Sequence, residues 1–382
     1  MLAKEDYKFM ARAIQLAKKG QYTTHPNPRV GCVITKNNKI IGEGFHKRAG
    51  EPHAEINALS NCKKIAGEES SQGATAYVTL EPCSHTGKTP PCANALIEAN
   101  VSRVVIAMQD PNPQVAGQGV QHLQDAGIDV EVGVFEKLSR QLNPGFIKRM
   151  EKGLPWVRVK LAMSLDGRTA MASGESKWIT GSEARQDVQK LRASADAILT
   201  GIGTVLADDP SLNVRLSASE LGIKGEVHQP KRIIIDTHLR TPLDAKLLKL
   251  EGETLMVVAK RAKSTASQDE QKISAFQAMG ASFLEVEKDS SGRLPLETVL
   301  QQLAKQEINE IHVEAGATLC GSLIQQKVVD EIILYVAPVF MGSDARGLLD
   351  LPRLETMKDK IGLSIDDIRA VGNDFRLSIQ PI

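Results

Sequence analysis

The sequence predicts an α/β protein with two domains. Its 382 residues exceed the roughly 100–200 residues of an average domain. Segments with helical periodicity alternate with short apolar runs, which is typical of α/β folds. Residues 140–156 interrupt this alternation with Pro, Gly and four basic residues, and so predict the junction. We expect one domain over residues 1–147 and a second over residues 148–382.

The first domain is expected to begin with a helix over residues 5–19, which Gly20 ends. A β-hairpin follows, because two apolar runs flank Asn37 and Asn38 within residues 29–47. The remaining elements are a helix near 53–64, a strand within 73–82, a helix within 91–100, a strand within 102–111, and a helix and a strand within 118–134.

The second domain is expected to repeat the alternation. Its predicted strands lie within residues 156–164, 196–205, 231–237, 254–260, 330–340 and 374–382. Helices are predicted within 181–195 and 296–307, and a strand, glycine turn and helix within 310–329. Residues 260–272 predict a polar surface stretch.

Composition excludes several classes of protein. A formal net charge of +1 provides no general attraction to nucleic acid or to an anionic membrane. No apolar run approaches the ~18 residues of a membrane span, and the first residues lack the apolar core of a secretory signal. Five cysteines form no disulfide framework in a chain of this length. We expect a cytoplasmic enzyme with reduced thiols.

Two motifs predict a zinc site. In "PHAEINAL", His53 and Glu55 begin a predicted helix, and "EPCSHTGKTPPC" supplies Cys83 and Cys92 after prolines. One imidazole and two thiolates leave the fourth tetrahedral position of zinc for a water, whose pKa the metal lowers. Glu55 suits a proton carrier that does not bind the metal. The same combination of residues occurs in zinc nucleobase deaminases.

A structural zinc site is the alternative, with His85 as a fourth ligand. Eight residues separate Cys83 from Cys92, whereas structural sites usually place their cysteines two to four residues apart. The same eight-residue insert holds His85, Lys88 and Thr89, which suit an anionic group of the substrate. A solvated surface loop remains the other interpretation of this insert.

In the second domain, "HVEAGATLCGSLI" leads from a strand through Gly316 into a helix whose first residues are small. Such a helix start binds phosphate in many proteins, although close packing explains it equally well. Residues 201–215 carry Asp208, Asp209 and Arg215 in a segment with few regular signals, which suits a site loop or a surface loop. A single Trp such as Trp178 is by default a packing residue.

Taken together, "THPNPRVGCV", "PHAEINAL", "TLEPCSHTGKTPPC" and "DPNP" resemble the deaminase half of the family of bifunctional riboflavin biosynthesis proteins. The resemblance implies a cytidine-deaminase-like three-layer fold, with His53, Cys83 and Cys92 as zinc ligands and Glu55 as the proton shuttle. It also implies that Asn27 holds the pyrimidine. The ribose phosphate side is then expected to contact His85, Lys88, Asp110 and Asn112.

The segments "VKLAMSLDGRTA", "SKWITG", "ADAILTGIGTVLADDPSLNVR" and "VEAGATLCGSL" are similar to the family's reductase half. This likeness implies a dihydrofolate-reductase-like α/β domain that uses NADPH. The implied cofactor residues are Ala162, Trp178, Thr204, Asp208, Gly316, Ala317, Thr318, Leu319, Cys320, Gly321 and Ser322. The implied substrate residues are Ser176, Arg192, Leu212, Arg215 and Glu314, and Lys160 is expected near the reacting sugar.

The function implied is zinc-dependent deamination of a phosphorylated pyrimidine, followed by NADPH-dependent reduction of its ribosyl chain. The family's members usually associate, so we expect a homo-oligomer, either dimer or tetramer. One rival is a nucleic-acid deaminase, for which a basic surface and a two-residue cysteine gap are typical. The other is a zinc-stabilised nucleotide-binding regulator, in which Glu55 has no task.

Overall fold

The computed structural model describes residues 3–84, 91–113, 115–260 and 266–382, with the backbone alone for 266–269. The predicted site residues His85 and Lys88, and Thr89 of the same insert, lie outside the described residues. The chain divides into two compact units, Met1–Gly153 and Leu154–Ile382. Among the described residues, no helix is both long enough and apolar enough to cross a membrane.

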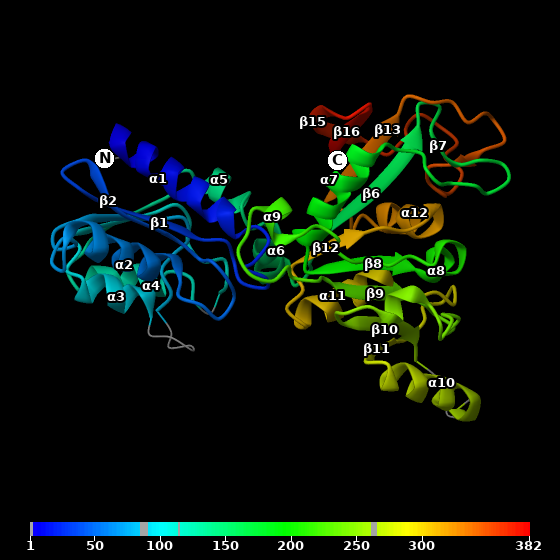
Figure 1. Ribbon diagram of the computed structural model, residues 1–382, viewed down its shortest axis with the longest axis horizontal. Coiled ribbons are helices and arrows are strands. Elements are labelled where there is room, and N and C mark those ends of the chain that lie inside the picture. The colour runs from blue at the N-terminus through cyan, green and yellow to red at the C-terminus, as the bar shows by residue number, and fades with distance from the viewer. Residues whose placement is uncertain (1–2, 85–90, 114, 261–265) are drawn as a thin grey trace. The chain divides into compact units, whose positions relative to one another are not determined.

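The first unit is a five-stranded sheet between two layers of helices (Figure 1). The strand order is β2-β1-β3-β4-β5, in which β1 runs antiparallel to β2 and β3, and β3, β4 and β5 are parallel. Its strands are β1 (Gly31–Lys36), β2 (Lys39–Phe45), β3 (Thr75–Val78), β4 (Arg103–Ile106) and β5 (Asp129–Val132). Its helices are α1 (Lys4–Ala17), the short η1 (Lys18–Gly20), α2 (Ala54–Ala66), α3 (Cys92–Glu98), α4 (Gln118–Asp125), α5 (Glu136–Arg140) and α6 (Pro144–Lys152).

Two apolar cores fill the spaces between these layers. Helices α2, α3 and α4 pack on one face of the sheet, against residues such as Ile34, Val78 and Ile106. Helix α1 covers the opposite face, where Val33 and Val105 meet it. Successive side chains of a strand point to opposite faces, so both faces of the central strands are buried.

Residues 140–156, which the sequence presented as a junction, contain a helix. Pro144 occupies the first turn of α6, where its missing N–H costs nothing. Ile147 of this helix packs against Leu80 and Met108, so α6 belongs to the first unit. The predicted boundary at residues 147/148 falls inside α6, whereas the compact units divide after Gly153.

The second unit is built on a nine-stranded sheet in the order β11-β10-β9-β8-β12-β6-β13-β16-β15. Its strands are β6 (Trp156–Ser164), β8 (Ala197–Gly201), β9 (Lys231–Ile235), β10 (Thr254–Ala259), β11 (Ala281–Val286), β12 (Glu310–Val313), β13 (Glu331–Ala337), β15 (Leu363–Val371) and β16 (Asp374–Pro381). The strands β7 (Arg168–Ala170) and β14 (Arg346–Gly347) form a separate pair. All neighbours from β11 to β13 are parallel, and β16 and β15 are added antiparallel.

Helices cover both faces of this sheet (Figure 1). They are α7 (Ser182–Ala193), α8 (Ile202–Asp208), α9 (Ala218–Leu221), η2 (Lys246–Lys249), α10 (Ala266–Ala278), α11 (Leu296–Lys305) and α12 (Ala317–Gln325). Apolar residues of α11 and α12 pack on one face, as Leu300 and Leu323 do. Residues of α7, α8 and α10 pack on the other face, among them Val188, Val205 and Phe276.

One expectation for the second half was wrong in detail. The strand expected over residues 196–205 ends at Gly201, and α8 begins at once, because the chain turns into a helix at the carboxyl edge of the sheet. In the stretch 260–272, expected to be a polar surface, the described side chains are exposed or partly buried. The same stretch contains the start of α10, whose later residue Phe276 is fully buried. Because Phe276 lies beyond the polar stretch, the stretch alone did not indicate a helix.

Candidate functional sites

The three predicted metal ligands meet at one point in the first unit. His53 is the N-cap of α2, Cys92 is the first residue of α3, and Cys83 lies in the loop after β3. The donor atoms of the three side chains lie within 4.8 Å of one another. The His53 Nδ1 atom lies 3.3 Å from Cys92 Sγ and 3.7 Å from Cys83 Sγ.

These separations fit a zinc ion. Ligands on a tetrahedron with Zn–N near 2.1 Å and Zn–S near 2.3 Å lie about 3.6 Å apart. Cys83 is the more acidic thiol of the pair, because hydrogen bonds from Cys92 and His53 lower its pKa. Cys92 N–H also donates to Cys83 Sγ at 3.3 Å. A soft, partly ionised donor set of this kind is what zinc selects.

Glu55 lies in the first turn of α2, two residues after His53, and its side chain is 3% exposed. Burial raises the pKa of its carboxyl to about 7, and the nearby Cys83 thiolate acts in the same direction. A carboxyl with a pKa near neutrality is suited to accept and return a proton.

Asn27 is held by a histidine that the sequence did not single out. His46 is 2% exposed, and burial lowers its pKa, so the ring is neutral. Its Nδ1 lies 3.3 Å from the Pro52 carbonyl oxygen, an acceptor, so Nδ1 carries the proton. Nε2 therefore accepts from the Asn27 amide nitrogen at 3.2 Å. The amide oxygen of Asn27 is thereby left pointing away from His46, as a hydrogen-bond acceptor.

Asp110 and Asn112 follow β4, at the same sheet edge as the Cys83 loop after β3. Asp110 Oδ1 accepts the Asn112 N–H at 2.9 Å. A small hollow lies against Cys83, and its lining includes Ser84 and Asp110. The buried Ser84 hydroxyl faces no hydrogen-bond partner within the described part of the chain, and no motif pointed to it.

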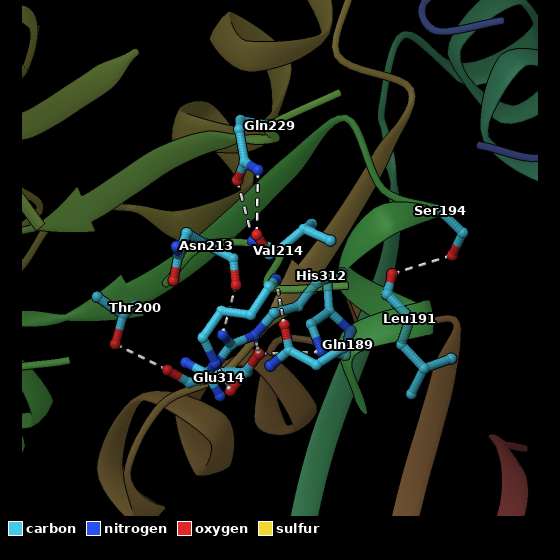
Figure 2. A network of polar contacts seen from close by, with 11 residues as sticks. Gln189, Leu191, Ser194, Thr200, Asn213, Val214, Gln229, His312 and Glu314 are labelled. Carbon is cyan, nitrogen blue, oxygen red and sulfur yellow. Dashed lines mark hydrogen bonds and ion pairs between the residues drawn. The ribbon is translucent and has the colours of Figure 1, made fainter. Parts of the chain in front are cut away.

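In the second unit, a largely buried ion pair joins two of the predicted substrate residues, Arg192 and Glu314. Arg192 of α7 donates to both carboxylate oxygens of Glu314, at 2.5 and 2.8 Å, and Glu314 directly follows β12. The guanidinium holds the pKa of Glu314 well below its usual range despite the opposing effect of burial. His312 Nε2 lies 3.3 Å from the same carboxylate (Figure 2). No motif in the sequence indicated this contact.

The segment that carries Leu212 and Arg215 is fastened to this pair. Arg192 donates to the carbonyl of Asn213 at 2.9 Å, and Gln229 exchanges two hydrogen bonds with the backbone of Val214 (Figure 2). The Arg215 N–H donates to Gln189 at 2.9 Å. Leu212 adopts a positive φ of 46° with its side chain buried, whereas Arg215 is exposed.

Lys160 of β6 belongs to the same cluster. Burial lowers the pKa of its ammonium group, Glu314 opposes this shift, and Arg192 adds to it. The buried polar residues of β6 and β12 alternate with residues of the apolar core, so they face α7. The charges of Glu314 and Arg192 also affect the pKa of Arg215, so Lys160, Arg192 and Arg215 all interact electrostatically with the Glu314 carboxylate.

Helices α8 and α12 begin side by side at the carboxyl ends of β8 and β12. The Gly316 N–H donates to Thr204 Oγ1 at 3.1 Å. The first turn of α12 contains no acidic residue, and Gly316 and Thr318 are exposed there. Open α/β sheets bind ligands outside these strand ends, so this edge fits the phosphates of a nucleotide.

The later residues of the predicted phosphate loop are packed into the protein. The Cys320 thiol donates to the Ala315 carbonyl and lies in the apolar core. A Cβ at Gly321 would lie 2.1 Å from the Asp350 carbonyl oxygen, so this glycine is required for close packing. Leu319 and Ser322 are partly buried, and the Ser322 hydroxyl donates to Thr318 O.

Four predicted residues stand apart from the Arg192–Glu314 cluster. Within the described ranges, no hydrogen bond or ion pair joins this cluster to Ala162, Ser176, Trp178 or Asp208. Trp178 is 72% exposed, contrary to a packing role, and the Arg185 guanidinium lies 4.5 Å from the centre of its ring. Asp208 is the exposed last residue of α8.

Comparison with known proteins decides the family. The family model of the cytidine and deoxycytidylate deaminase zinc-binding region matches residues 3–108, and that of the RibD C-terminal domain matches residues 155–377. Riboflavin biosynthesis protein RibD of Escherichia coli is 50% identical over 380 residues, which cover 98% of this chain and 99% of that protein. The chain belongs to the RibD family of riboflavin biosynthesis proteins.

Solved structures of RibD proteins agree in fold. One crystal form of Acinetobacter baumannii RibD is 47% identical with a TM-score of 0.88, and covers 99% of both chains. A diaminohydroxyphosphoribosylaminopyrimidine deaminase/5-amino-6-(5-phosphoribosylamino)uracil reductase from Thermotoga maritima is 31% identical with a TM-score of 0.82, again over 99% of both chains. The RibD family protein described here is thus a bifunctional enzyme of riboflavin biosynthesis, with a zinc-dependent deaminase activity and an NADPH-dependent reductase activity.

Proposed function

We propose that residues 1–153 deaminate 2,5-diamino-6-(5-phosphoribosylamino)pyrimidin-4-one to 5-amino-6-(5-phosphoribosylamino)uracil. Residues 154–382 then reduce the ribosyl chain of this product to a ribityl chain with NADPH. The observation that carries the proposal is the convergence of one imidazole and two thiols beside a buried glutamate with a raised pKa. The printed name of the Thermotoga maritima relative, which combines both reactions, supports it.

In the deaminase, His53, Cys83 and Cys92 would hold the zinc ion, which would supply Lewis-acid activation of a water. The water oxygen would bond to the ring carbon that carries the amino group, and Glu55 would carry the proton of the water to the amino nitrogen, which leaves as ammonia. Asn27 presents its amide oxygen to the pyrimidine because His46 occupies its amide nitrogen. Asp110 and Asn112 contact the ribose phosphate side, together with His85 and Lys88.

In the reductase, NADPH supplies the hydride when bound. Its phosphates would contact the first turn of α12 at Gly316, Ala317 and Thr318, where the Gly316 N–H is held in place by Thr204. Ala162, Trp178 and Asp208 complete the cofactor side. The exposed Arg215 binds the substrate phosphate beside Arg192, while Ser176, Leu212 and Glu314 shape the sugar site. Lys160 lies next to this cluster and faces the sugar.

A two-stage assay on the purified protein tests the proposal. Ammonia release from the phosphoribosylaminopyrimidine is followed without NADPH, and NADPH oxidation is followed after the cofactor is added. We expect ammonia first and oxidation only after deamination. Oxidation that precedes deamination would reverse the proposed order, and zinc-loaded protein that releases no ammonia would refute the deaminase assignment.

The Cys92→Ser variant tests the metal site separately. Removing one of two thiolates is expected to abolish zinc binding and ammonia release. Reduction of supplied 5-amino-6-(5-phosphoribosylamino)uracil should continue, because the two sites belong to different compact units. Retention of one zinc per chain in this variant would contradict the proposed ligand set.

We further propose that the enzyme is a cytoplasmic homo-oligomer and requires no nucleic-acid or membrane partner. A surface of the β15–β16 hairpin supports association. A register shift after Ile365 keeps the apolar residues of both strands on one face. This face consists of Leu363, Ile365, Ile368, Ala370, Phe375, Leu377, Ile379 and Pro381. Although Ile379 is buried, Ile365, Ile368 and Phe375 are 54, 59 and 51% exposed, as is typical of an interaction surface.

A second copy of the chain is the proposed occupant, because an uncharged apolar face is complementary to itself about a two-fold axis. Sedimentation equilibrium should show a dimer or tetramer for the native chain. The double variant Ile365→Lys, Ile368→Lys should sediment as a smaller species. A native chain that sediments as a monomer would refute association.

A further inference from the structure

Glu81 lies between β3 and Cys83, and its side chain is withdrawn from solvent, with 5% exposed. Its carboxylate accepts four backbone N–H groups. One oxygen, Oε2, accepts from Asp110 and Gly117, both at 3.0 Å. The other, Oε1, accepts from Gly119 at 2.8 Å and from Val120 at 3.2 Å.

The four N–H groups belong to the segment that carries Asp110 and Asn112. Asp110 begins it after β4, and Gly117, Gly119 and Val120 form the start of α4. The first N–H groups of a helix have no acceptor within the helix, and a carboxylate there also interacts favourably with the helix dipole. Glu81 therefore binds the backbone at both ends of the described residues 110–113 and 115–120, which we call the substrate-side loop.

A close approach of two backbones ties the same loop to the metal centre. A Cβ at Gly119 would lie 2.1 Å from the carbonyl oxygen of Pro82, so only glycine fits at this position of α4. Pro82 directly precedes Cys83. The start of α4 thus contacts the Pro82 peptide, which directly precedes a metal ligand. The Glu81 carboxylate, just before Pro82, binds the backbone of the same loop.

We propose that Glu81 is a positioning residue of the deaminase, which sets the substrate-side loop at a fixed distance from the Cys83 ligand. The proposal rests on the function proposed above for Asp110 and Asn112. The position of Asp110 in turn restricts that of Asn112, because the Asp110 carboxylate accepts the Asn112 N–H. A carboxylate is required because it is a pure acceptor with two oxygens, and each oxygen serves two donors.

The Glu81→Gln variant keeps the size of the side chain but replaces one acceptor oxygen by a donor NH₂ group. Two of the four backbone N–H groups then face a donor. Hydrogen exchange measured on the zinc-loaded full chain should become at least about tenfold faster in peptides that cover residues 109–121. Peptides of β1 and of the second unit should keep their native rates, and zinc content should stay at one per chain.

Kinetics separate positioning from a merely structural role. We expect the KM of Glu81→Gln for the phosphoribosylaminopyrimidine to rise about tenfold, with a smaller fall in kcat, as is usual when an outer contact of a site is lost. Reduction of supplied aminouracil substrate should be unchanged. Glu81→Asp, which keeps both oxygens, should recover part of the KM. The control Glu98→Gln changes an exposed glutamate on α3 and should match the native chain.

Three results would overturn the proposal. They are native exchange rates over residues 109–121, loss of zinc from Glu81→Gln, or faster exchange with native KM. Failure of the proposed function looks different, because then the native chain itself releases no ammonia from the pyrimidine. The exchange measurement still decides in that case whether Glu81 anchors the loop.

Discussion

Glu55 in the first unit and Glu314 in the second are both largely removed from water, yet their carboxyl groups have opposite pKa shifts. Glu55 is 3% exposed and forms no ion pair with a cation in the described part of the chain, so burial raises its pKa to about 7. The Glu314 side chain is 16% exposed, and the bidentate Arg192 keeps its pKa well below the usual range.

The comparison shows that burial alone does not define the task of a carboxyl group. Where burial dominates, the protonated and ionised forms are close in free energy, and the group is able to exchange a proton. Where a guanidinium is paired with it, the group remains an anion and serves as a fixed point of the structure. We therefore expect Glu55 to act in chemistry and Glu314 to hold Arg192 and its neighbours in place.

The largest effect is expected for Glu55→Gln, which preserves size and removes the proton carrier. The kcat of deamination should fall by about 10³-fold, within the range for loss of a positioned acid/base group. Zinc content and the reductase activity should be native. The measurement is ammonia release under substrate saturation, with zinc determined on the same sample. A variant that keeps its native kcat would show that Glu55 carries no proton in the reaction, and the proposed difference in role between Glu55 and Glu314 would then be wrong.

Next in size is the effect of Glu314→Gln on the second unit. It leaves the mostly buried Arg192 without a counter-charge, which should lower the free energy of unfolding by about 3 kcal/mol. Both tryptophans, Trp156 and Trp178, lie in the second unit, so their fluorescence in a urea titration reports this unit alone. An unchanged midpoint would show that Glu314 is no anchor. Glu297→Gln, on α11, is a matched change of charge outside the cluster.

The pH dependence of stability also tests whether the Glu314 carboxylate remains an anion in the folded protein. Because the pKa of Glu314 is depressed in the folded state, its ion pair stabilises fully above the unfolded value of about 4.3. This stabilisation is lost as the pH falls further through the folded value. The urea midpoints of the native chain and of Glu314→Gln should therefore differ by a constant amount from pH 7 to 5.5. They should converge below pH 4, and a difference that grows on acidification would give the wrong sign.

The metal centre was predictable because its information is local. His53 and Cys92 each start a helix directly after a proline, and the spacing within two short motifs brings the ligands together. His46 and Glu81 were missed for a physical reason. Each acts on backbone groups or amides distant in sequence, 19 residues away for Asn27 and 29 for Asp110, and no residue pattern records such contacts.

The second site was less accessible to sequence reasoning. Arg192 and Glu314 are separated by 122 residues, and they meet only because β12 inserts between β8 and β6 in the sheet. Family resemblance supplied both residues, but neither their pairing nor the part of His312. Gly321 of α12 shows the opposite limit of sequence reasoning. A small residue was expected there to bind a phosphate, but the glycine is needed for the close approach of the Asp350 carbonyl.

The smallest effect is expected for variants of Thr204, whose hydroxyl holds the backbone that follows Glu314. The Glu314 carbonyl accepts the Thr200 hydroxyl at 2.7 Å, and the Gly316 N–H donates to Thr204 Oγ1. Thr204→Val keeps the shape and removes that acceptor, at a cost of about 1 kcal/mol, or about fivefold in KM for NADPH. Thr204→Ser keeps the hydroxyl and should retain the native KM.

The two variants of Thr204 test whether its hydroxyl positions the Gly316 peptide for the cofactor or only stabilises the fold. If Thr204→Val raises the KM for NADPH while the urea midpoint stays native, the cofactor depends on the position of the Gly316 peptide itself. If instead the midpoint falls as in Glu314→Gln and the KM is unchanged, the hydroxyl serves only the stability of the sheet edge. Ammonia release should be native in both variants, since Thr204 lies outside the unit that holds Glu55.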